Sequence, residues 1–416
     1  MTTPLTVMIP LGGIGSRFQK EGYTKPKPFV SVLGKPMILW VLDSLKLSPQ
    51  DALVVVYNPS WMSPKYWGEV LAKYPNLQLV ELPGATRGAA ETVLIGLTGL
   101  SKQLRQRPIM LVDGDCFYDE DIVSQYRAIA PRSNGVFFFV DTQPKPIYSY
   151  IVFDAPTRKI TQVKEKVKIS DHANTGCYCF SKGSELMAHC QALLDAGATQ
   201  TGNLATHTVG EYYTSGVIAA MIEEGAPFTA LQIDPTRMHV LGTPTQLLEW
   251  SMEQKSAPSS RICFDLDHTL LTPANEPLVD NVATCRVLYE QGHTIILQTE
   301  RGMAEHGGNT AAATAAIAAP TLAALAKYRI PYHELHFGKP VADFYVDDRA
   351  VSSMADLPKE IGHYANSAYK ATPAAPSTAA DAVPLQPAPR GAPWSLVLLA
   401  TIAGAGCGFA FASLKK

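Results

Sequence analysis

The sequence has few of the features that mark secreted, disulfide-bonded or nucleic-acid-binding proteins. Its 7 cysteines are scattered and no Cys-x-x-Cys occurs, which argues against a disulfide framework or a zinc site and favours a reducing compartment. The formal net charge is only −2, so we expect no nucleic-acid partner. No basic segment precedes a long apolar run at the N-terminus, and the short stretch Leu5–Leu11 predicts a buried strand rather than a signal peptide.

What the chain does have is length and an ordinary globular composition. Its 416 residues exceed what one core usually holds, and 46% hydrophobic with 17% charged residues is typical of folded domains. Up to about residue 250, short apolar runs alternate with helical patterns, which predicts a mixed, mostly parallel α/β sheet covered on both faces. The strands expected there are 6–10, 53–57, 78–82, 109–112, 135–140, 150–154, 159–164 and 175–180, and the helices are 36–47, 88–100 and 119–130.

A second strand–helix series follows a polar linker near residues 253–260. Its expected strands are 261–264, 294–298 and 343–346, and its expected helices are 281–291 and 309–327. The domain boundaries predicted from these patterns are 1–255 and 260–365.

The C-terminal segment differs from both domains. Residues 366–393 are rich in Ala, Pro, Ser and Thr, which predicts a flexible tether. Residues 394–413 contain no charge and at ~1.5 Å per residue would just span a ~30 Å hydrocarbon core. We therefore expect a single-pass tail anchor at 394–414 with the catalytic domains in the cytoplasm. Gly404 and Gly408 form a GxxxG that could join two copies in the membrane.

The first chemical signature follows the first strand. Leu11-Gly12-Gly13-Ile14-Gly15 would leave backbone N–H groups open to phosphate oxygens, and Arg17 and Lys27 would add cations. A dinucleotide site is disfavoured because Phe18 stands where a third glycine is needed. A purely structural turn is the remaining alternative.

The order of several motifs resembles the nucleotidyltransferase family that makes NDP-sugars and CDP-alcohols. The loop Gly13–Phe18 and Pro26-Lys27-Pro28 match its signature, and further matches follow at Gly88–Thr92, Asp113-Gly114-Asp115, Glu165-Lys166, Asn174–Gly176 and Gly242-Thr243-Pro244. The resemblance implies a Rossmann-like domain that transfers a nucleotidyl group from an NTP with Mg²⁺. It implies catalytic roles for Arg17 and Lys27, nucleotide contacts from Leu11, Gly12, Gly13, Gly15, Gly88 and Glu91, a metal ligand in Asp115, and acceptor contacts from Glu165, Lys166, Asn174 and Gly176.

Two positions depart from that family. Val240 stands where many sugar pyrophosphorylases have a second metal-binding Asp, and Ile151 stands where many have a sugar-contacting Gly. Without an Asp at position 240, the site would bind a single metal ion or use Glu211 as a second ligand. Ile151 in place of Gly suggests an acceptor other than an ordinary hexose 1-phosphate. Structural alternatives stay open, since Asp113 could cap a helix and Glu165-Lys166 could be an exposed pair.

The second signature is Asp265-Leu266-Asp267-His268-Thr269 after an apolar strand. One carboxylate could attack phosphorus while the other protonates the leaving oxygen, and two acids so close call for a cation such as Mg²⁺. This resembles the haloacid dehalogenase superfamily, and specifically its small phosphatases of capsule and surface-polysaccharide synthesis. The resemblance implies catalytic Asp265, Asp267, Thr299 and Lys339, and metal ligands Asp265, Asp267, Asp347 and Asp348.

The spacing of these four motifs limits the phosphatase domain. Asp265 and Thr299, and Thr299 and Lys339, stand too close in sequence for a large lid domain, so a capless Rossmannoid domain with an open site is expected. We read the chain as a membrane-tethered bifunctional enzyme with an NTP and a small phosphorylated acceptor as substrates. The alternative is a phosphatase whose N-terminal domain only binds nucleotide as a sensor or scaffold.

Overall fold

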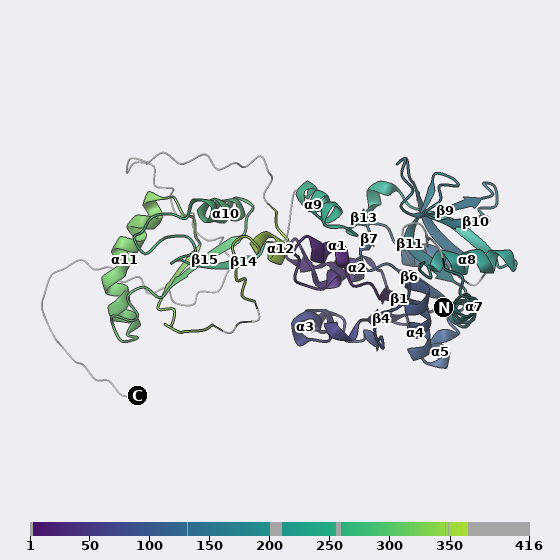
Figure 1. The fold of residues 1–416 in the computed structure, drawn as a ribbon, viewed down its shortest axis with the longest axis horizontal. Coiled ribbons are helices and arrows are strands. Elements are labelled where there is room, and N and C mark those ends of the chain that lie inside the picture. The colour runs from purple at the N-terminus through teal and green to yellow at the C-terminus, as the bar shows by residue number, and fades with distance from the viewer. Residues whose placement is uncertain are drawn as a thin grey trace, which may run out of the picture. The chain divides into compact units, whose positions relative to one another are not determined.

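The computed structural model describes residues 3–130, 132–199, 210–254, 259–345, 347 and 349–364. Two sets of buried hydrophobic side chains lie within them, one between Leu5 and Leu247 and the other between Ile262 and Leu357. We call residues 3–254 the N-terminal lobe, purple to teal in Figure 1, and residues 259–364 the C-terminal lobe, green to yellow.

The N-terminal lobe alternates strands and helices as its sequence predicts. Its strands are β1 (Thr6–Leu11), β2 (Ser31–Val32), β3 (Lys35–Pro36), β4 (Ala52–Tyr57), β5 (Gln78–Glu81), β6 (Ile109–Val112), β7 (Cys116–Tyr118), β8 (Asn134–Val140), β9 (Ser149–Phe153), β10 (Ile160–Glu165), β11 (His172–Phe180), β12 (Phe228–Gln232) and β13 (Met238–Val240). Its helices are α1 (Ser16–Lys20), α2 (Met37–Ser44), α3 (Pro64–Lys73), α4 (Ala89–Gly99), α5 (Lys102–Arg105), α6 (Ile122–Ile129), α7 (Gly183–Asp195), α8 (Thr214–Glu223) and α9 (Pro244–Glu253).

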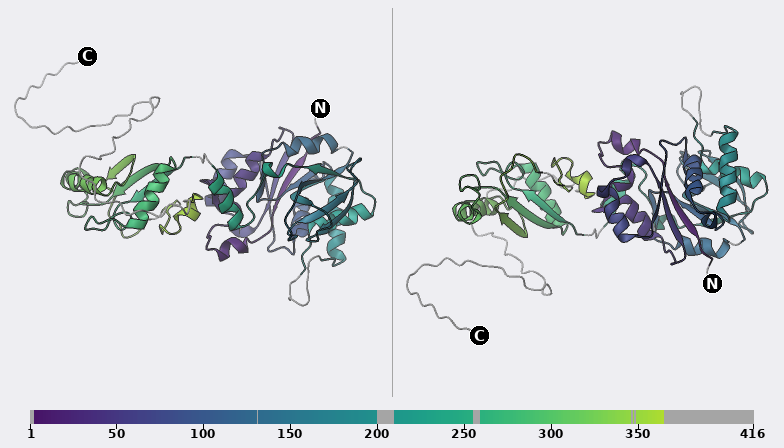
Figure 2. Two further views of the ribbon diagram at one scale, coloured as in Figure 1. Left: turned by 90° about the horizontal axis from the view of Figure 1, so that it is seen from above. Right: turned by 90° about the horizontal axis from the view of Figure 1, so that it is seen from below.

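One mixed sheet organises this lobe, and Figure 2 shows helices on both of its faces. Its main path runs β10-β9-β11-β6-β1-β4-β5, in which β6, β1, β4 and β5 are parallel. The strand β11 is antiparallel to β6, β8 and β9. Because β1 and β6 are parallel neighbours, the loops that follow them meet at one edge of the sheet, where open α/β sheets bind ligands.

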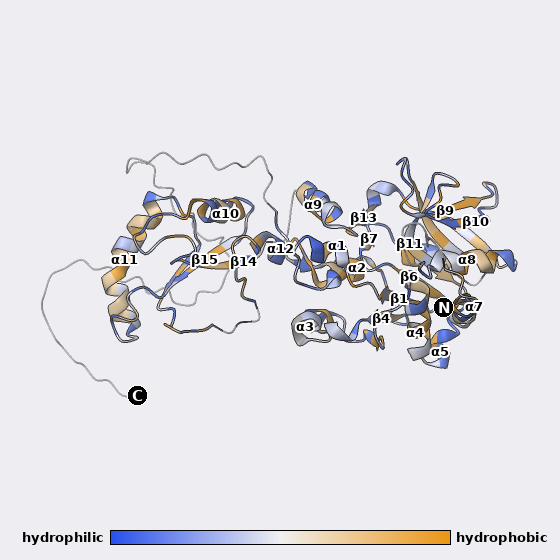
Figure 3. Cartoon of the chain, in the orientation of Figure 1, coloured by the Kyte–Doolittle hydropathy of each residue, from blue (hydrophilic) through white to orange (hydrophobic). Residues whose placement is uncertain are grey.

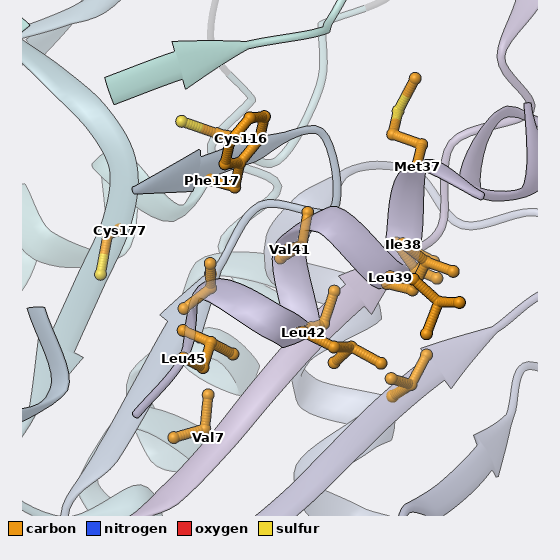
Figure 4. Close-up of a cluster of buried hydrophobic side chains, with 14 of the residues drawn as sticks. Val7, Met37, Ile38, Leu39, Val41, Leu42, Leu45, Cys116, Phe117 and Cys177 are labelled. Atoms are coloured by element: carbon orange, nitrogen blue, oxygen red, sulfur yellow. The ribbon is translucent and has the colours of Figure 1, made fainter. Parts of the chain in front are cut away.

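The core explains why β1 and α2 form where they do. All residues of β1 but Pro10 are buried, as befits a strand covered on both faces. The helix α2 buries Met37, Ile38, Leu39, Val41 and Leu42, and Figure 4 shows these side chains grouped with Val7, Leu45 and Phe117. Cys177 and Cys179 are buried on β11, where they pack as small hydrophobic side chains.

The C-terminal lobe has one parallel sheet of order β14-β15-β16. Its elements are β14 (Arg261–Asp265), α10 (Val279–Glu290), β15 (Thr294–Thr299), α11 (Thr310–Lys327), β16 (Glu334–Phe337) and α12 (Leu357–Ile361). The segments between Asp265, Thr299 and Lys339 hold only α10, β15, α11, β16 and connecting turns, so they contain no lid domain, as the sequence predicts.

One predicted strand is wrong. Residues 343–345 are not in a strand, and β16 lies earlier, at Glu334–Phe337. The apolar side chains of Phe344 and Tyr345 suggested a strand, but Phe344 is 88% exposed and so buries no surface against a sheet. The short alternation in Glu-Leu-His-Phe was the true strand pattern.

One described helix, α11, is long and apolar enough to cross a membrane by length and composition alone. Figure 3 shows orange along much of it, yet it begins at an Asn309 cap, contains Pro320 and packs Ala324 and Leu325 against the core of its lobe. These contacts indicate a surface helix of a folded lobe. The expected tether and tail anchor at 366–414 lie outside the described residues.

Candidate functional site

The glycine loop carries the chain from β1 to α1. Gly15 precedes α1 with φ at 71°, a left-handed conformation that favours glycine, and a Cβ there would lie 2.9 Å from the Lys27 side chain. The loop forms one wall of a cavity of about 190 Å³ at the edge of the sheet. Its lining residues are Pro10, Leu11, Gly13, Lys27, Pro28, Trp61, Asp113, Gly114 and Asp115.

Lys27, Asp115 and Gly242 converge in this cavity from three distant parts of the sequence. The Lys27 ammonium donates to an Asp115 carboxylate oxygen and, at 3.2 Å, to the Gly242 carbonyl. The backbone N–H of Leu241 donates to the Asp115 carbonyl at 2.7 Å, and Thr243 caps α9 by accepting from the Gln246 N–H. The Gly-Thr-Pro turn is therefore part of the site and holds both charged groups in place.

Asp113 lies beside this pair and is exposed in the cavity that it lines. Desolvation by the surrounding protein atoms, together with the nearby Asp115 carboxylate, raises the pKa of Asp113 to about 8. Gly176, with φ at 86°, packs directly on it, because a Cβ there would lie 2.3 Å from Asp113 Oδ2. Asp113 does not cap a helix, since α6 begins at an Asp121 cap. The structure thus places Gly176 against the side chain of Asp113, a role that the sequence did not predict.

The residues here suit a divalent cation bound together with phosphates. Among the described residues, no three His, Cys, Asp or Glu side chains are grouped to hold a metal unaided. Asp113 and Asp115 nevertheless bring two carboxylates together, and the raised pKa of Asp113 reflects negative charge that a cation would neutralise. Mg²⁺ characteristically takes one or two carboxylates and completes its shell with substrate phosphates and water. Val240 lies in β13, paired with Cys116 of β7, and offers no ligand.

The predicted nucleotide loop packs against Tyr212. Gly88, at φ 150°, could not carry a Cβ, which would lie 2.5 Å from the Tyr212 carbonyl oxygen. Glu91 accepts from the Arg87 backbone N–H at 2.6 Å and pairs with its guanidinium, an interaction that lowers the pKa of Glu91. Glu91 therefore shapes this loop in the structure, and its predicted contact with nucleotide stays a prediction.

Gly12 faces the same loop. A Cβ on Gly12 would lie 2.2 Å from the Thr92 hydroxyl and 2.9 Å from that of Thr86, and these two hydroxyls are hydrogen-bonded to each other at 2.8 Å. The close approach explains the need for glycine at this position. The loop after β1 and the loop before α4 thus lie against each other.

The predicted acceptor residues lie on β10 and β11. Glu165 is largely buried, which raises its pKa, and it accepts from the Ser215 hydroxyl at 2.8 Å. Lys166 is half-exposed, with its Nζ 3.8 Å from a Glu165 oxygen. Asn174 is buried and donates to the Ser149 hydroxyl at 2.6 Å. One member of the pair, Glu165, is therefore largely buried, so the pair is not the fully exposed one that was the structural alternative.

Two residues around the cavity differ from expectation. Arg17 is exposed on α1 and is not among the residues that line the cavity, so its predicted catalytic role stays a prediction. Trp61, which follows β4, lines the cavity with only 6% of its surface exposed. Sequence reasoning missed Trp61, and the only available signal was its position just beyond the carboxyl end of a buried strand.

In the C-terminal lobe, three of the four predicted phosphatase motifs meet at the carboxyl ends of parallel strands. Lys339 Nζ lies 3.2 Å from Asp265 Oδ1, and the Thr299 hydroxyl donates to Asp267 at 3.1 Å. The backbone N–H groups of Gly338 and Lys339 both donate to the Thr299 carbonyl. Burial raises the pKa of Asp265, and the Lys339 ammonium opposes this shift.

Arg301 was missed at this site. Its Nε donates to both Asp267 oxygens, at 2.8 and 3.0 Å, and its Nη1 donates to Asn275 at 2.6 Å. Arg301 thus orients the carboxylate predicted to act as the acid. The sequence places an arginine two residues after the strand-ending Thr299, which was the available signal.

The structure gives less information on the other two predicted metal ligands of this lobe, Asp347 and Asp348. Asp347 accepts from the Arg349 backbone N–H at 2.7 Å in a turn, and Asp348 lies outside the described residues. Asp265 and Asp267 supply carboxylates of the kind that binds Mg²⁺, but within the described chain no three-member metal cluster forms here either. A cavity of about 560 Å³ adjoins Lys339 and is lined by Met303, Ala304, Gly307, Gly308, Thr310, Gly338, Pro340 and Val341.

Known proteins resemble the N-terminal lobe. Residues 6–206 match the family described as nucleotidyl transferase. The chain is 28% identical over 149 residues to a ribitol-5-phosphate cytidylyltransferase of Vibrio parahaemolyticus, covering 34% of this chain and 58% of the relative. It is 40% identical over 95 residues to a 2-C-methyl-D-erythritol 4-phosphate cytidylyltransferase of Dechloromonas aromatica, covering 22% and 37%.

A solved structure also matches this part of the chain. It is a nucleoside-diphosphate-sugar pyrophosphorylase from Vibrio cholerae, with 22% identity and a TM-score of 0.47, covering 59% of this chain and 100% of that one. The chain spans about half the length of the curated relatives it matches. The family match assigns a nucleotidyl transferase domain to the N-terminal part of the chain.

Proposed function

We propose that this chain, whose N-terminal part is a nucleotidyl transferase domain, transfers a nucleotidyl group from an NTP to a small phosphorylated acceptor and releases pyrophosphate. The observation that carries the proposal is the convergence of Lys27, Asp115 and the Gly242 turn beside Asp113, whose pKa is raised. Residues so distant in sequence meet at the edge of the sheet where an NTP would lie.

The reaction requires that the two substrates be aligned and that the negative charge on the phosphates be neutralised. The acceptor phosphate oxygen attacks the α-phosphorus in line, the bond to the β-phosphate bridging oxygen breaks, and pyrophosphate leaves. Lys27 would neutralise charge that develops on the phosphates, and Lys166 would hold the attacking phosphate. Asp115 and Asp113 would hold Mg²⁺, which supplies charge neutralisation when bound.

The finer identity of the substrates rests on the relatives. Two of them are cytidylyltransferases for alcohol phosphates, so CTP with a sugar-alcohol phosphate is the first pair to test. Ile151 is buried in β9, where many sugar pyrophosphorylases have glycine, and this favours an acceptor other than a hexose 1-phosphate. UTP, GTP and dTTP with sugar phosphates complete the substrate panel.

We further propose that the C-terminal lobe is a Mg²⁺-dependent phosphatase that acts on a related phosphomonoester. Asp265 would attack phosphorus and Asp267 would give a proton to the departing alcohol, after which water would release inorganic phosphate from Asp265. Lys339 would stabilise the charge on the phosphoryl group, and the contacts that join Asp265, Asp267, Thr299 and Lys339 support these roles. Together the two reactions would serve surface glycoconjugate synthesis.

Two substitutions test the assignment of one reaction to each lobe. We expect Asp115→Ala to lower pyrophosphate release by at least about 100-fold and to leave phosphatase activity unchanged. Asp265→Asn should do the reverse. Asp195→Ala, which removes an exposed carboxylate, is the matched control. Loss of both activities from either single substitution would refute the assignment.

Val240 motivates the second candidate function, in which the N-terminal lobe binds nucleotide as a sensor for the phosphatase. Calorimetry with each NTP, run beside the pyrophosphate assay, separates the two. Binding without turnover across the whole panel would favour the sensor, whereas turnover with any pair would exclude it.

The membrane anchor at 394–414 and its cytoplasmic orientation are proposals from sequence alone. A variant that ends at residue 393 should move from the membrane fraction to the soluble fraction and retain both activities. Membrane association that persists in this variant would refute the anchor.

A further inference from the structure

The segment Tyr212–Ser215, which leads into α8, contacts both predicted substrate subsites of the N-terminal lobe. On one side, the Tyr212 carbonyl accepts from the Ala90 N–H at 2.9 Å, and the Tyr212 N–H donates to the Arg87 carbonyl at 3.2 Å. The Arg87 guanidinium also lies over the Tyr212 ring, 5.3 Å from its centre. These contacts tie the segment to the loop that holds Gly88.

On its other side, the same segment holds the acid–lysine pair. The Lys166 ammonium donates to the Tyr213 hydroxyl at 2.7 Å and lies 4.5 Å from the centre of its ring. The Ser215 hydroxyl donates to Glu165 at 2.8 Å. Two neighbouring side chains therefore fix both members of the pair, each by a contact to a charged group, which is the stronger kind of hydrogen bond.

The backbone at Lys166 supports a functional reason for this arrangement. Lys166 has φ at 52°, a left-handed conformation that disfavours a long side chain, and its N–H donates to the Tyr148 carbonyl at 2.9 Å. Strain of this kind persists where the surrounding structure enforces it, and it is found most often at functional sites. A flexible lysine held by a strained backbone and an aromatic ring has lost much of its freedom before any substrate arrives.

We propose that Tyr213 is a positioning residue that holds the Lys166 ammonium for the acceptor phosphate, and that Tyr212–Ser215 keeps this lysine in register with the nucleotide loop. The inference rests on the proposed transferase function. Acceptor and NTP must meet with their reacting atoms aligned, and a connector that contacts both subsites fixes one relative to the other.

Tyr213→Phe in the full-length chain is the main test, because phenylalanine keeps the ring and removes only the hydroxyl. We expect the KM for the acceptor to rise about tenfold, which is the effect of losing one hydrogen bond to a charged group, while the KM for the NTP changes less than twofold. Tyr213→Leu removes the ring as well and should raise the acceptor KM further.

The chain offers a matched control in the other lobe. Lys327 donates to the Tyr328 hydroxyl at 2.5 Å and lies 4.5 Å from its ring, so Tyr328→Phe breaks an equivalent pair away from the transferase site. This variant should leave both transferase KM values unchanged. If Tyr213→Phe raised the KM for the acceptor and the KM for the NTP equally, or lowered Tm, its role would be merely structural. Either result would overturn the proposal.

A second readout does not depend on catalysis. Brief acetic anhydride labelling followed by peptide mass spectrometry compares Lys166 with exposed Lys164, which lies on β10 two residues earlier. Tyr213→Phe should speed labelling of Lys166 at least threefold and leave Lys164 unchanged. If the wild-type chain turns over no NTP–acceptor pair, the transferase proposal fails, and the labelling still decides whether Tyr213 restrains Lys166. An unchanged labelling ratio would overturn the inference.

Discussion

Gly176→Ala tests how far the position of the Asp113 side chain depends on the buried glycine beside it. A Cβ at Gly176 would lie 2.3 Å from Asp113 Oδ2, far inside van der Waals contact, and the residue also has φ at 86°. The left-handed backbone costs a non-glycine residue about 1–2 kcal/mol. Overpacking in a core costs about 1–3 kcal/mol more. We therefore expect Gly176→Ala to lower the free energy of unfolding by about 2–5 kcal/mol.

Gly197→Ala is the matched control because it isolates the backbone contribution. Gly197 has φ at 63°, and among the described residues no atom lies within 4 Å of the Cβ it would gain. This variant should lose only about 1–2 kcal/mol. The difference between the two variants then measures the contact with Asp113 alone.

Denaturant unfolding followed by tryptophan fluorescence suits this comparison. Four of the five tryptophans, Trp40, Trp61, Trp67 and Trp250, belong to the N-terminal lobe, and residues 259–364 contain none. With the fifth removed by Trp394→Phe in every variant, the signal reports one lobe. Gly176→Ala should also lose transferase activity under native conditions, since Asp113 must move, whereas Gly197→Ala should keep it. Equal midpoints for the two variants would refute the packing argument.

Two further predictions concern the C-terminal lobe. His268 has φ at 57°, a left-handed backbone conformation that strains a non-glycine residue, so His268→Gly should stabilise this lobe by about 1 kcal/mol. Hydrogen-exchange protection of the lobe's amides measures this gain, and unchanged or lower protection would show that the backbone at His268 is not strained. Burial, with the neighbouring His293 ring, lowers the pKa of His363 to about 4, so the unfolded chain takes up a proton first as pH falls. Stability should be complete above pH 6.5 and decline by up to about 3 kcal/mol toward pH 4, and His363→Phe should flatten this decline in melts followed by circular dichroism.

The sequence predicted those parts of the sites that are properties of single strands and their ends. Asp265, Thr299 and Lys339 were expected together because they match the motifs of one family, and in the structure they lie at or just after the ends of three parallel strands. Glycine positions were likewise predictable, since tight loops and positive φ leave a signal in residue type. The described part of the chain therefore agrees best with the sequence where local geometry alone fixes the site.

What the sequence could not reveal depends on tertiary contacts. Trp61 and Tyr213 carry no motif, and they reach their sites only because the sheet brings β4 and α8 there. The close approach of Asp113 to Gly176 needs β11 to lie beside β6, an antiparallel pairing between strands far apart in sequence. The strand expected at 343–346 failed for the opposite reason, because apolar residues alone do not show that a partner strand is present.

The Gly242 turn has a consequence for the order in which the protein becomes active during its synthesis. Lys27 emerges early from the ribosome and Asp115 follows, but the Lys27 ammonium is held by the Gly242 carbonyl and the Asp115 backbone carbonyl by the Leu241 N–H, near the end of the lobe. The glycine loop after β1 is therefore synthesised long before the Gly242 turn that holds the Lys27 ammonium. A nascent chain that has not yet released α9 can fold most of its sheet while its catalytic pair remains unsecured, so transferase activity should begin only as the last helix of the lobe docks.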